Sequence, residues 1–304
     1  MRYSYYTADV FTDQIFGGNQ LAVFPDATGL NPEQMQQVTR EFNFSETAFV
    51  FPPQQSDNTR LVRIFTPDAE VPFAGHPTLG TAHVLADIGE IPLKSETTNI
   101  VFEEGVGPVK VRIQARDGQP LFTQLSVAMP PENGPPPPPV GDIAAVLTLN
   151  ESDISVGKYA PAAMSCGLPF LFVPLKSLQA VQKASLSRDK WQTILSGYWA
   201  PHLFLFSSET EWEDTDLHAR MFAPGLGVDE DPATGSAAVT LAGYLAGRDD
   251  LKTGTLKWVI EQGFEIGRKS VLTIEADKNA GEITDLRVGG PSVTVCRGKM
   301  EIPD

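Results

Sequence analysis

Cysteine is scarce in this chain. Only two cysteines, Cys166 and Cys296, occur among 304 residues, and they lie far apart without C-x-x-C spacing. This usage predicts neither a disulfide framework nor a zinc site, and no third side chain stands at metal-ligand spacing beside the histidines. We therefore expect a protein of the reducing cytoplasm that holds no metal.

Positive charge and long apolar runs are also lacking. Lysine and arginine number 23 against 38 acidic residues, which gives a net charge of −15. Because phosphate groups are bound by clustered basic side chains, neither nucleic acid nor an anionic membrane is expected as a partner. No apolar run reaches the roughly 18 residues that span a bilayer, and the first residues do not read as a secretory signal.

What the chain does contain is an internal repeat. Residues 63–86 read RIFTPDAEVPFAGHPTLGTAHVLA, and residues 220–242 read RMFAPGLGVDEDPATGSAAVTLA. Both copies begin with Arg-x-Phe-x-Pro. A Pro-x-x-Gly-[Ser/Thr]-Ala motif follows, with its glycine at Gly80 in the first copy and at Gly235 in the second. Two copies are too few for a solenoid, so the repeat indicates a duplicated domain.

Each copy predicts a short strand, a loop rich in proline and glycine, and an apolar helix that starts at Gly80-Thr81 or at Gly235-Ser236. The first N–H groups of a helix have no partner inside the helix, and they lie at the positive end of its dipole. A glycine there lets a carboxylate or phosphate approach the backbone closely. We expect the two helix starts to face one cleft and to bind a small acid.

A proline-rich stretch marks the boundary that we expect between two domains. Residues 131–139 include five consecutive prolines at 135–139, a run that favours an extended segment. The prediction is an N-terminal domain at 1–130, a linker at 131–139 and a C-terminal domain at 140–284. The alternative is a surface loop within one domain. Many short strands with few amphipathic helices indicate an α+β fold.

Three polar residues near these motifs are candidates for chemistry. His76 precedes the first predicted helix start, where it can bond a ligand, and Asp231 takes the matching position in the second copy. Glu46 stands at the mouth of an apolar strand between Phe44 and Phe49, where half burial would suit it for acid–base work. The alternatives are a structural histidine, a loop carboxylate and an exposed turn glutamate.

Five motifs, FGGNQLAVF, FSETAFV, FAGHP, DPATGSA and EQGFEIGR, together resemble the phenazine-biosynthesis PhzF-type isomerase family along nearly the whole chain. The resemblance implies a diaminopimelate epimerase-like fold. Such a fold has two similar domains, each a curved β-sheet or barrel around a central helix, related by a pseudo-twofold axis with the active site between them. It also implies that the final strand, near 285–304, returns to the first domain, and family members often form homodimers. The proline run is not a family feature.

The resemblance further implies an isomerase that needs no metal or cofactor and that moves a proton between carbons of a small carboxylic acid. Glu46 would be the general acid–base, with His76 and Asp231 as further catalytic residues. Related racemases use two cysteines at the helix starts; because Cys166 and Cys296 lie elsewhere, a two-thiol racemase is not expected. The substrate contacts would come from Ser45, Gly75, Gly80, Thr81, Gly235 and Ser236. The alternative is a protein on the same scaffold that binds a small acid without catalysis.

Overall fold

The computed structural model describes residues 1–127 and 131–303. The chain folds into two units, the first made of Met1–Ser126 with Gly289–Asp304 and the second of Val127–Val288. The end of the chain thus belongs to the first unit. None of the helices in the described ranges is long and apolar enough to cross a membrane.

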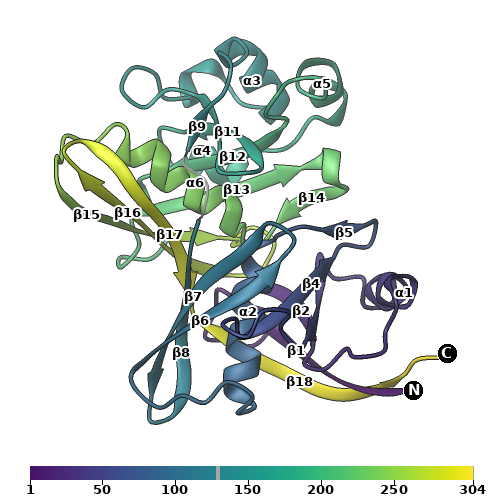
Figure 1. The fold of residues 1–304 in the computed structure, drawn as a ribbon. Coiled ribbons are helices and arrows are strands. Elements are labelled where there is room, and N and C mark those ends of the chain that lie inside the picture. The colour runs from purple at the N-terminus through teal and green to yellow at the C-terminus, as the bar shows by residue number, and fades with distance from the viewer. Residues whose placement is uncertain (128–130, 304) are drawn as a thin grey trace. The chain divides into compact units, whose positions relative to one another are not determined.

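The first unit is a sheet that curves around one helix. Its elements are β1 (Arg2–Val10), β2 (Asn19–Phe24), α1 (Pro32–Phe42), β3 (Glu46–Phe51), β4 (Arg60–Phe65), β5 (Glu70–Val71), α2 (Gly75–Asp87), β6 (Thr97–Glu104), β7 (Gly107–Arg116), β8 (Gln119–Ser126) and β18 (Ser292–Glu301). Helix α2 is buried from Gly75 to Ala86 and contacts β1, β2, β3, β7, β8 and β18 (Figure 1). A helix with strands on several sides needs apolar residues all round, which explains its weak amphipathicity.

The second unit has the same kind of core. Its elements are β9 (Glu132–Asn133), α3 (Val140–Leu147), a 3₁₀ turn (Glu151–Asp153), β10 (Ala162–Ser165), β11 (Pro169–Pro174), α4 (Leu178–Lys183), α5 (Arg188–Ile194), β12 (His202–Ser207), β13 (Leu217–Ala223), a 3₁₀ turn (Pro224–Leu226), β14 (Val228–Asp231), α6 (Gly235–Ala246), β15 (Gly254–Gln262), β16 (Ser270–Asn279) and β17 (Glu282–Gly290). Helix α6 is the buried one here, and it contacts β10, β15 and β16.

The strand pairing confirms the duplication that the repeat predicted. In the first unit β2 and β3 are parallel, β3 and β4 antiparallel, and β4 and β6 parallel. In the second unit β11 and β12, β12 and β13, and β13 and β15 follow the same order of directions. A short strand pairs antiparallel with the middle strand in each case, β5 with β4 and β14 with β13. The central helix follows that short strand in both units.

Local signals in the sequence explain helix α1. Asn31 accepts a hydrogen bond from the Gln34 amide while the Gln34 side chain bonds back, and Pro32 occupies the first helical position. This capping box satisfies N–H groups that would otherwise lack a partner. The helix ends where Asn43 adopts the left-handed conformation. The sequence predicts a helix that starts at Asn31-Pro32-Glu33 and ends near Asn43, and the structure confirms both ends.

The predicted start of the first central helix is wrong by five residues. Helix α2 begins at Gly75, so Gly80 and Thr81 lie inside it and are buried. Pro77 falls in the first helical turn, where a missing N–H costs nothing, so the proline does not delay the helix. By structure Gly75 corresponds to Gly235, and His76 corresponds to Ser236 rather than to Asp231.

The proline-rich residues 131–139 pack within the second unit. β9 pairs with β10, and the Gly134 amide donates to the Ala163 carbonyl at 2.8 Å. The Tyr198 hydroxyl lies 2.9 Å from the Pro135 carbonyl and 3.2 Å from that of Pro136. Pro139 then provides the N-cap position of α3. The predicted boundary at residue 130 itself lies outside the described residues.

Gly80 provides a test of this corrected helix start. An added Cβ at Gly80 would lie 2.6 Å from side-chain carbons of both Leu21 and Val10. We expect Gly80→Ala to lower the free energy of unfolding by about 1–3 kcal/mol, the usual cost of overpacking a core. Gly197→Ala is the control, because no atom lies within 4 Å of its Cβ position. Chemical denaturation of both variants measures the difference; equal stabilities would contradict the packing described for α2.

Candidate functional site

The start of α2 brings together the first two predicted catalytic residues. Glu46 is the first residue of β3, and its partner in the register is Leu21 on β2. His76 is the second residue of α2. The His76 Nε2 and Glu46 Oε2 atoms are 3.3 Å apart, with side-chain exposures of 7% and 18%. Two residues separated by thirty positions in the sequence therefore lie side by side, His76 buried and Glu46 half-buried.

His76 is neutral in this setting. Burial lowers the pKa of its imidazole from 6.5 to about 3, and a hydrogen bond to the Gln20 backbone only partly opposes the shift. Because Nε2 faces Glu46, the bond to Gln20 involves Nδ1. A bond that favours the charged form of a histidine is one that the ring donates, so Nδ1 carries the hydrogen and Nε2 has the lone pair.

The first turn of α2 has no side-chain cap. The N-cap residue is Ala74, which has no polar side chain and makes no capping hydrogen bond within the described residues. Gly75 is buried at the first helical position, and the predicted contact residue Ser45 lies half-buried directly before Glu46. A helix start of this kind is chemically suited to bind an anion through its first amides.

Glu104, at the end of β6, is a buried acid that the sequence analysis missed. The Thr78 hydroxyl, in the first turns of α2, lies 2.7 Å from Glu104 Oε1 and 2.8 Å from the Ala74 carbonyl. Burial raises the pKa of Glu104 to about 8, against the opposing effect of the Thr78 hydrogen bond. The only signal in the sequence was a glutamate at an inward-facing position of an alternating strand.

The start of α6 brings together the predicted residues of the second repeat. Asp231 is the last residue of β14, and Gly235 and Ser236 open the helix. Thr234 occupies the N-cap position, but its side chain makes no capping bond among the described residues. Its hydroxyl instead donates to Asp231 Oδ2 at 2.5 Å. As in α2, the N-cap side chain of a buried helix makes no capping bond to another described residue.

An arginine–glutamate pair precedes each of these helix starts. Arg63 on β4 binds both carboxylate oxygens of Glu70 at 2.7 and 2.6 Å. Arg220 on β13 binds both oxygens of Glu230 at 2.9 and 2.7 Å. Such bidentate pairs have a fixed geometry, so they hold the short strand that leads into each helix.

The phenylalanine two residues after each arginine takes part in the same arrangement. The Arg63 guanidinium lies 5.3 Å from the centroid of the Phe65 ring, and that of Arg220 lies 4.9 Å from the Phe222 ring. These distances allow a cation–π contact in both copies. The repeated Arg-x-Phe motif therefore has a structural role in positioning the helix starts.

A buried charged triad lies behind the second helix start. His218 on β13 is fully buried, with Nδ1 at 2.6 Å from Glu261 Oε1 and Nε2 at 2.8 Å from Glu265 Oε1. Burial alone would lower the pKa of His218, but the hydrogen bonds to the two carboxylates outweigh it and raise the pKa to about 9. Burial alone would raise the pKa values of Glu261 and Glu265, but the hydrogen bond and charge of His218, together with backbone hydrogen bonds, outweigh burial and lower both. The imidazole is therefore a cation at neutral pH.

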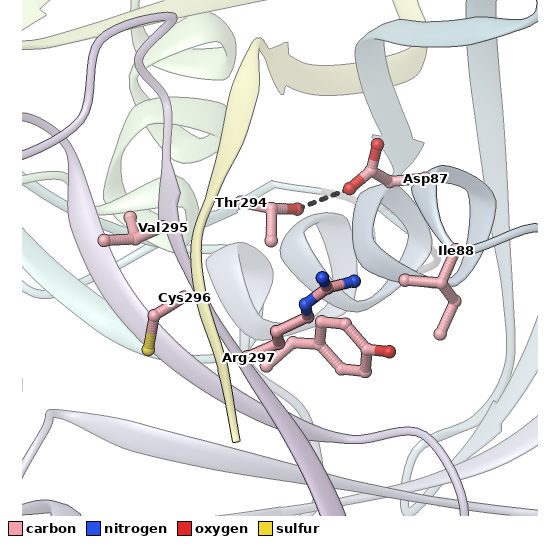
Figure 2. Close-up of a pocket in the computed structure, with 7 residues that line it drawn as sticks. Asp87, Ile88, Thr294, Val295, Cys296 and Arg297 are labelled. Atoms are coloured by element: carbon pink, nitrogen blue, oxygen red, sulfur yellow. Dashed lines mark hydrogen bonds between the residues drawn. The ribbon is translucent and has the colours of Figure 1, made fainter.

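A separate pocket of about 460 Å³ lies at the other end of α2 from His76 (Figure 2). Asp87 and Ile88 form one wall, and the bulge of β18 around Val295 forms another. The Thr294 hydroxyl donates to Asp87 Oδ2 at 2.8 Å across it. The predicted site residues do not line this pocket. Nor do three histidine, cysteine or acidic side chains gather as metal ligands anywhere in the described part of the chain.

The similarity to known proteins extends over nearly the whole chain. The sequence model of a family described as "phenazine biosynthesis-like protein" (PhzC-PhzF) matches residues 8–298. An uncharacterized isomerase of Mesorhizobium japonicum is 37% identical, over 98% of this chain and 99% of that protein. A trans-2,3-dihydro-3-hydroxyanthranilate isomerase of Pseudomonas fluorescens is 33% identical, over 98% and 99%.

A crystal structure of a PhzF-family protein of Bacillus anthracis has a TM-score of 0.89 at 24% identity, and the alignment covers 99% of this chain and 100% of that one. Identity at this level shows the fold alone. The fold is the α+β, diaminopimelate epimerase-like type that the motifs implied, with a central helix in each of two similar domains.

The buried triad gives the second unit a distinctive dependence on pH. The pKa of His218 is raised above the ordinary value of 6.5, so its contribution to stability is complete below pH 6.5 and is lost as the pH rises through about 9. A shift of this size corresponds to about 3 kcal/mol. We expect the free energy of unfolding to fall over this range in the wild type.

His218→Gln should lower the stability at pH 6 and remove most of that pH dependence. Chemical denaturation between pH 6 and 9.5 measures both effects, with His202→Gln as the control because burial lowers the pKa of His202 instead. A wild type and a His218→Gln variant with parallel pH profiles would contradict a charged His218.

Proposed function

Because the chain belongs to the family of phenazine biosynthesis-like proteins and is an isomerase, we propose that it moves a proton between two carbons of a small unsaturated carboxylic acid, with Glu46 as the general acid–base. The observation that carries this proposal is the 3.3 Å contact between Glu46 Oε2 and His76 Nε2 at the start of α2. It places the half-buried carboxyl group of Glu46 beside the buried, neutral imidazole of His76.

The proposed reaction needs only one proton carrier. Glu46 takes a proton from a carbon beside an unsaturated group, and the electron pair of the broken C–H bond moves into that conjugated system. The same carboxyl group then returns the proton to another carbon, so the double bond is relocated without oxidation or reduction. General acid–base assistance of this kind contributes typically about 10²–10⁴-fold in rate.

His76 would act through its lone pair. Its Nδ1 hydrogen is engaged by Gln20, so Nε2 can accept a hydrogen bond from the protonated Glu46 carboxyl group. Such a hydrogen bond would retain the proton on Glu46 after its removal from one carbon and before its return to the other, and would limit its exchange with water. Because the low pKa of His76 keeps the ring neutral, the histidine does not trap Glu46 as half of an ion pair.

The substrate class follows from the groups around the helix starts. In each unit the first amides of the buried helix suit a carboxylate, and in the second unit Asp231 suits an amino or hydroxyl group as a hydrogen-bond acceptor. Several relatives are named trans-2,3-dihydro-3-hydroxyanthranilate isomerases, after a ring compound that has these three groups. We infer a cyclic amino or hydroxy carboxylic acid as the substrate, isomerised without a cofactor.

The roles inferred for the remaining predicted residues differ. Ser45 lies directly before Glu46 and can donate a hydrogen bond to a substrate group. Gly80 and Thr81 are buried within α2, five and six residues beyond its start, so their support for the site is through packing. Within the helices, the substrate contacts are therefore assigned to the first turns, in addition to Ser45 and Asp231 outside them.

Replacing Glu46 by glutamine tests the role of the carboxylate. The amide keeps the size of the side chain but cannot accept a proton, so we expect the variant to bind substrate and to lose at least about 10²-fold in turnover. The test reaction is incorporation of deuterium from heavy water into trans-2,3-dihydro-3-hydroxyanthranilate and related acids, followed by NMR.

Glu33→Gln, an exposed change in α1, is the control and should exchange as the wild type does. Exchange that persists in Glu46→Gln would reject Glu46 as the proton carrier. A wild type that binds these acids but exchanges no proton would favour a binding protein over an enzyme.

A further inference from the structure

We propose that Gln262 is a positioning residue that holds the Thr234 hydroxyl away from α6 and so keeps the first amides of this helix open for a substrate anion. The proposal rests on the function proposed above, because it explains how the helix start remains uncapped. It also assigns a role to residues 261–265, EQGFE. These residues belong to a motif that carries the family resemblance but had no assigned role.

The side chain of Gln262 is fully buried, and its three hydrogen bonds all go to the loop between β14 and α6. Its Nε2 donates to the Asp231 carbonyl at 2.8 Å and to Thr234 Oγ1 at 3.0 Å. Its Oε1 accepts from the Thr234 amide at 3.2 Å. These three bonds, which we call the Gln262 clasp, join the two ends of the loop between β14 and α6. Only one orientation of the amide satisfies all three partners.

The clasp also determines where the hydroxyl hydrogen of Thr234 goes. Nε2 of Gln262 can only donate, and the carboxylate of Asp231 can only accept. Thr234 lies between them, so its hydroxyl accepts from Gln262 and gives its one hydrogen to Asp231 Oδ2. A threonine at this position would ordinarily cap the helix by accepting from an amide of the first turn. Here its oxygen is engaged elsewhere.

The backbone of Thr234 agrees with this interpretation. Asn31 and Ser177, whose side chains cap their α-helices, have ψ values of 165° and 157°. Thr234 has a ψ of 89° and makes no capping bond within the described residues. Because the clasp binds the Thr234 amide and the carbonyl three residues earlier, it keeps the loop out of the extended capping conformation.

The neighbouring residues fix the clasp itself. Gly263 adopts a φ of +78°, and an added Cβ would lie 2.6 Å from the Pro232 carbonyl oxygen, so the strand end packs directly on the loop. On the other side, Glu261 bonds His218, and Ala219 pairs with Gln262 in the parallel register of β13 and β15. The charged triad therefore holds the strand that carries Gln262.

The test is amide hydrogen exchange of the ligand-free protein, measured by NMR for wild type and Gln262→Leu. The Thr234 amide should exchange about tenfold faster, since it loses one hydrogen bond. The amides of Ser236 or Ala237 should exchange more slowly, by a similar factor, because the released hydroxyl can now cap them. General destabilisation would speed exchange everywhere, so the opposite change in the first turn identifies the positioning role.

Two further variants complete the design. In a Thr234→Val background there is no hydroxyl to release, so Gln262→Leu should no longer slow the first-turn amides. Gln36→Leu removes a similar clasp, in which Nε2 bonds the carbonyls of Thr66 and Pro67 at 2.8 and 2.9 Å, and should leave the α6 amides unchanged. First-turn exchange that is unchanged or faster in Gln262→Leu overturns the proposal, whether or not any acid binds.

A binding measurement then connects the clasp to the proposed function. Titration with 3-hydroxyanthranilate, a stable aromatic acid of the inferred class, should give a dissociation constant at least about tenfold weaker for Gln262→Leu, the equivalent of one charge-assisted hydrogen bond. An equal affinity in a variant that shows the slowed exchange would refute the link between clasp and substrate. Failure of the wild type to move a proton in any acid counts against the proposed function alone.

Discussion

The structure depends on two buried helices whose N-cap residues, within the described part of the chain, make no capping hydrogen bond. Helix α2 starts at Gly75 after an alanine, and α6 starts at Gly235 after a threonine whose hydroxyl is turned away. A helix start that receives no hydrogen bond from its N-cap side chain is suited to a ligand that supplies an acceptor. A ligand with negative charge accepts from the first N–H groups and gains from the helix dipole. In each unit, contacts to the loop before the helix hold the backbone in a conformation without a side-chain cap.

Each unit maintains this state by holding the loop before the helix. The pairs Arg63–Glu70 and Arg220–Glu230 fasten the short strands, and in the second unit the Gln262 clasp adds a second constraint. Strands placed around a helix supply most of the burial, but burial is not directional. Directional bonds are needed where the backbone has to remain in one conformation, and they lie at these loops.

The sequence predicted the parts of the fold that depend on local chemistry. Asn31, Pro32 and Gln34 specify the start of α1 through neighbouring atoms, so that helix was predicted well. The start of α2 was misjudged because Pro-x-x-Gly occurs in both copies at structurally different places. The arginine and glutamate of each pair show the true alignment: they are seven residues apart in one copy and ten in the other. That difference in length lies in the hairpin between the arginine strand and the short strand, β4–β5 or β13–β14. Aligning the two copies by residue identity alone could not locate it.

The candidate site was predictable as a set of residues and not as an arrangement. Glu46 and His76 were each identified from their surroundings in the sequence, but their contact and the neutral state of His76 depend on how β3 meets α2. Neither His218 nor Gln262 was identified as a site residue, because their partners are distant in the sequence. Parallel pairing of β13 and β15 brings Glu261 to His218, and Gln262 bonds the loop between β14 and α6. An inward-facing polar residue on a strand has no local signal beyond breaking the alternation.

The buried triad is best understood through its role in specifying this arrangement. Removing three charged side chains from water is expensive, and an apolar core of the same volume is often as stable. An apolar core, however, would allow β15 to slide or turn without loss of a particular partner. Because Glu261 and Glu265 flank Gln262 and both bind the one imidazolium of His218, the strand end has a single favourable position. The free energy spent on burying charge thus fixes the one amide that keeps the threonine from capping its helix.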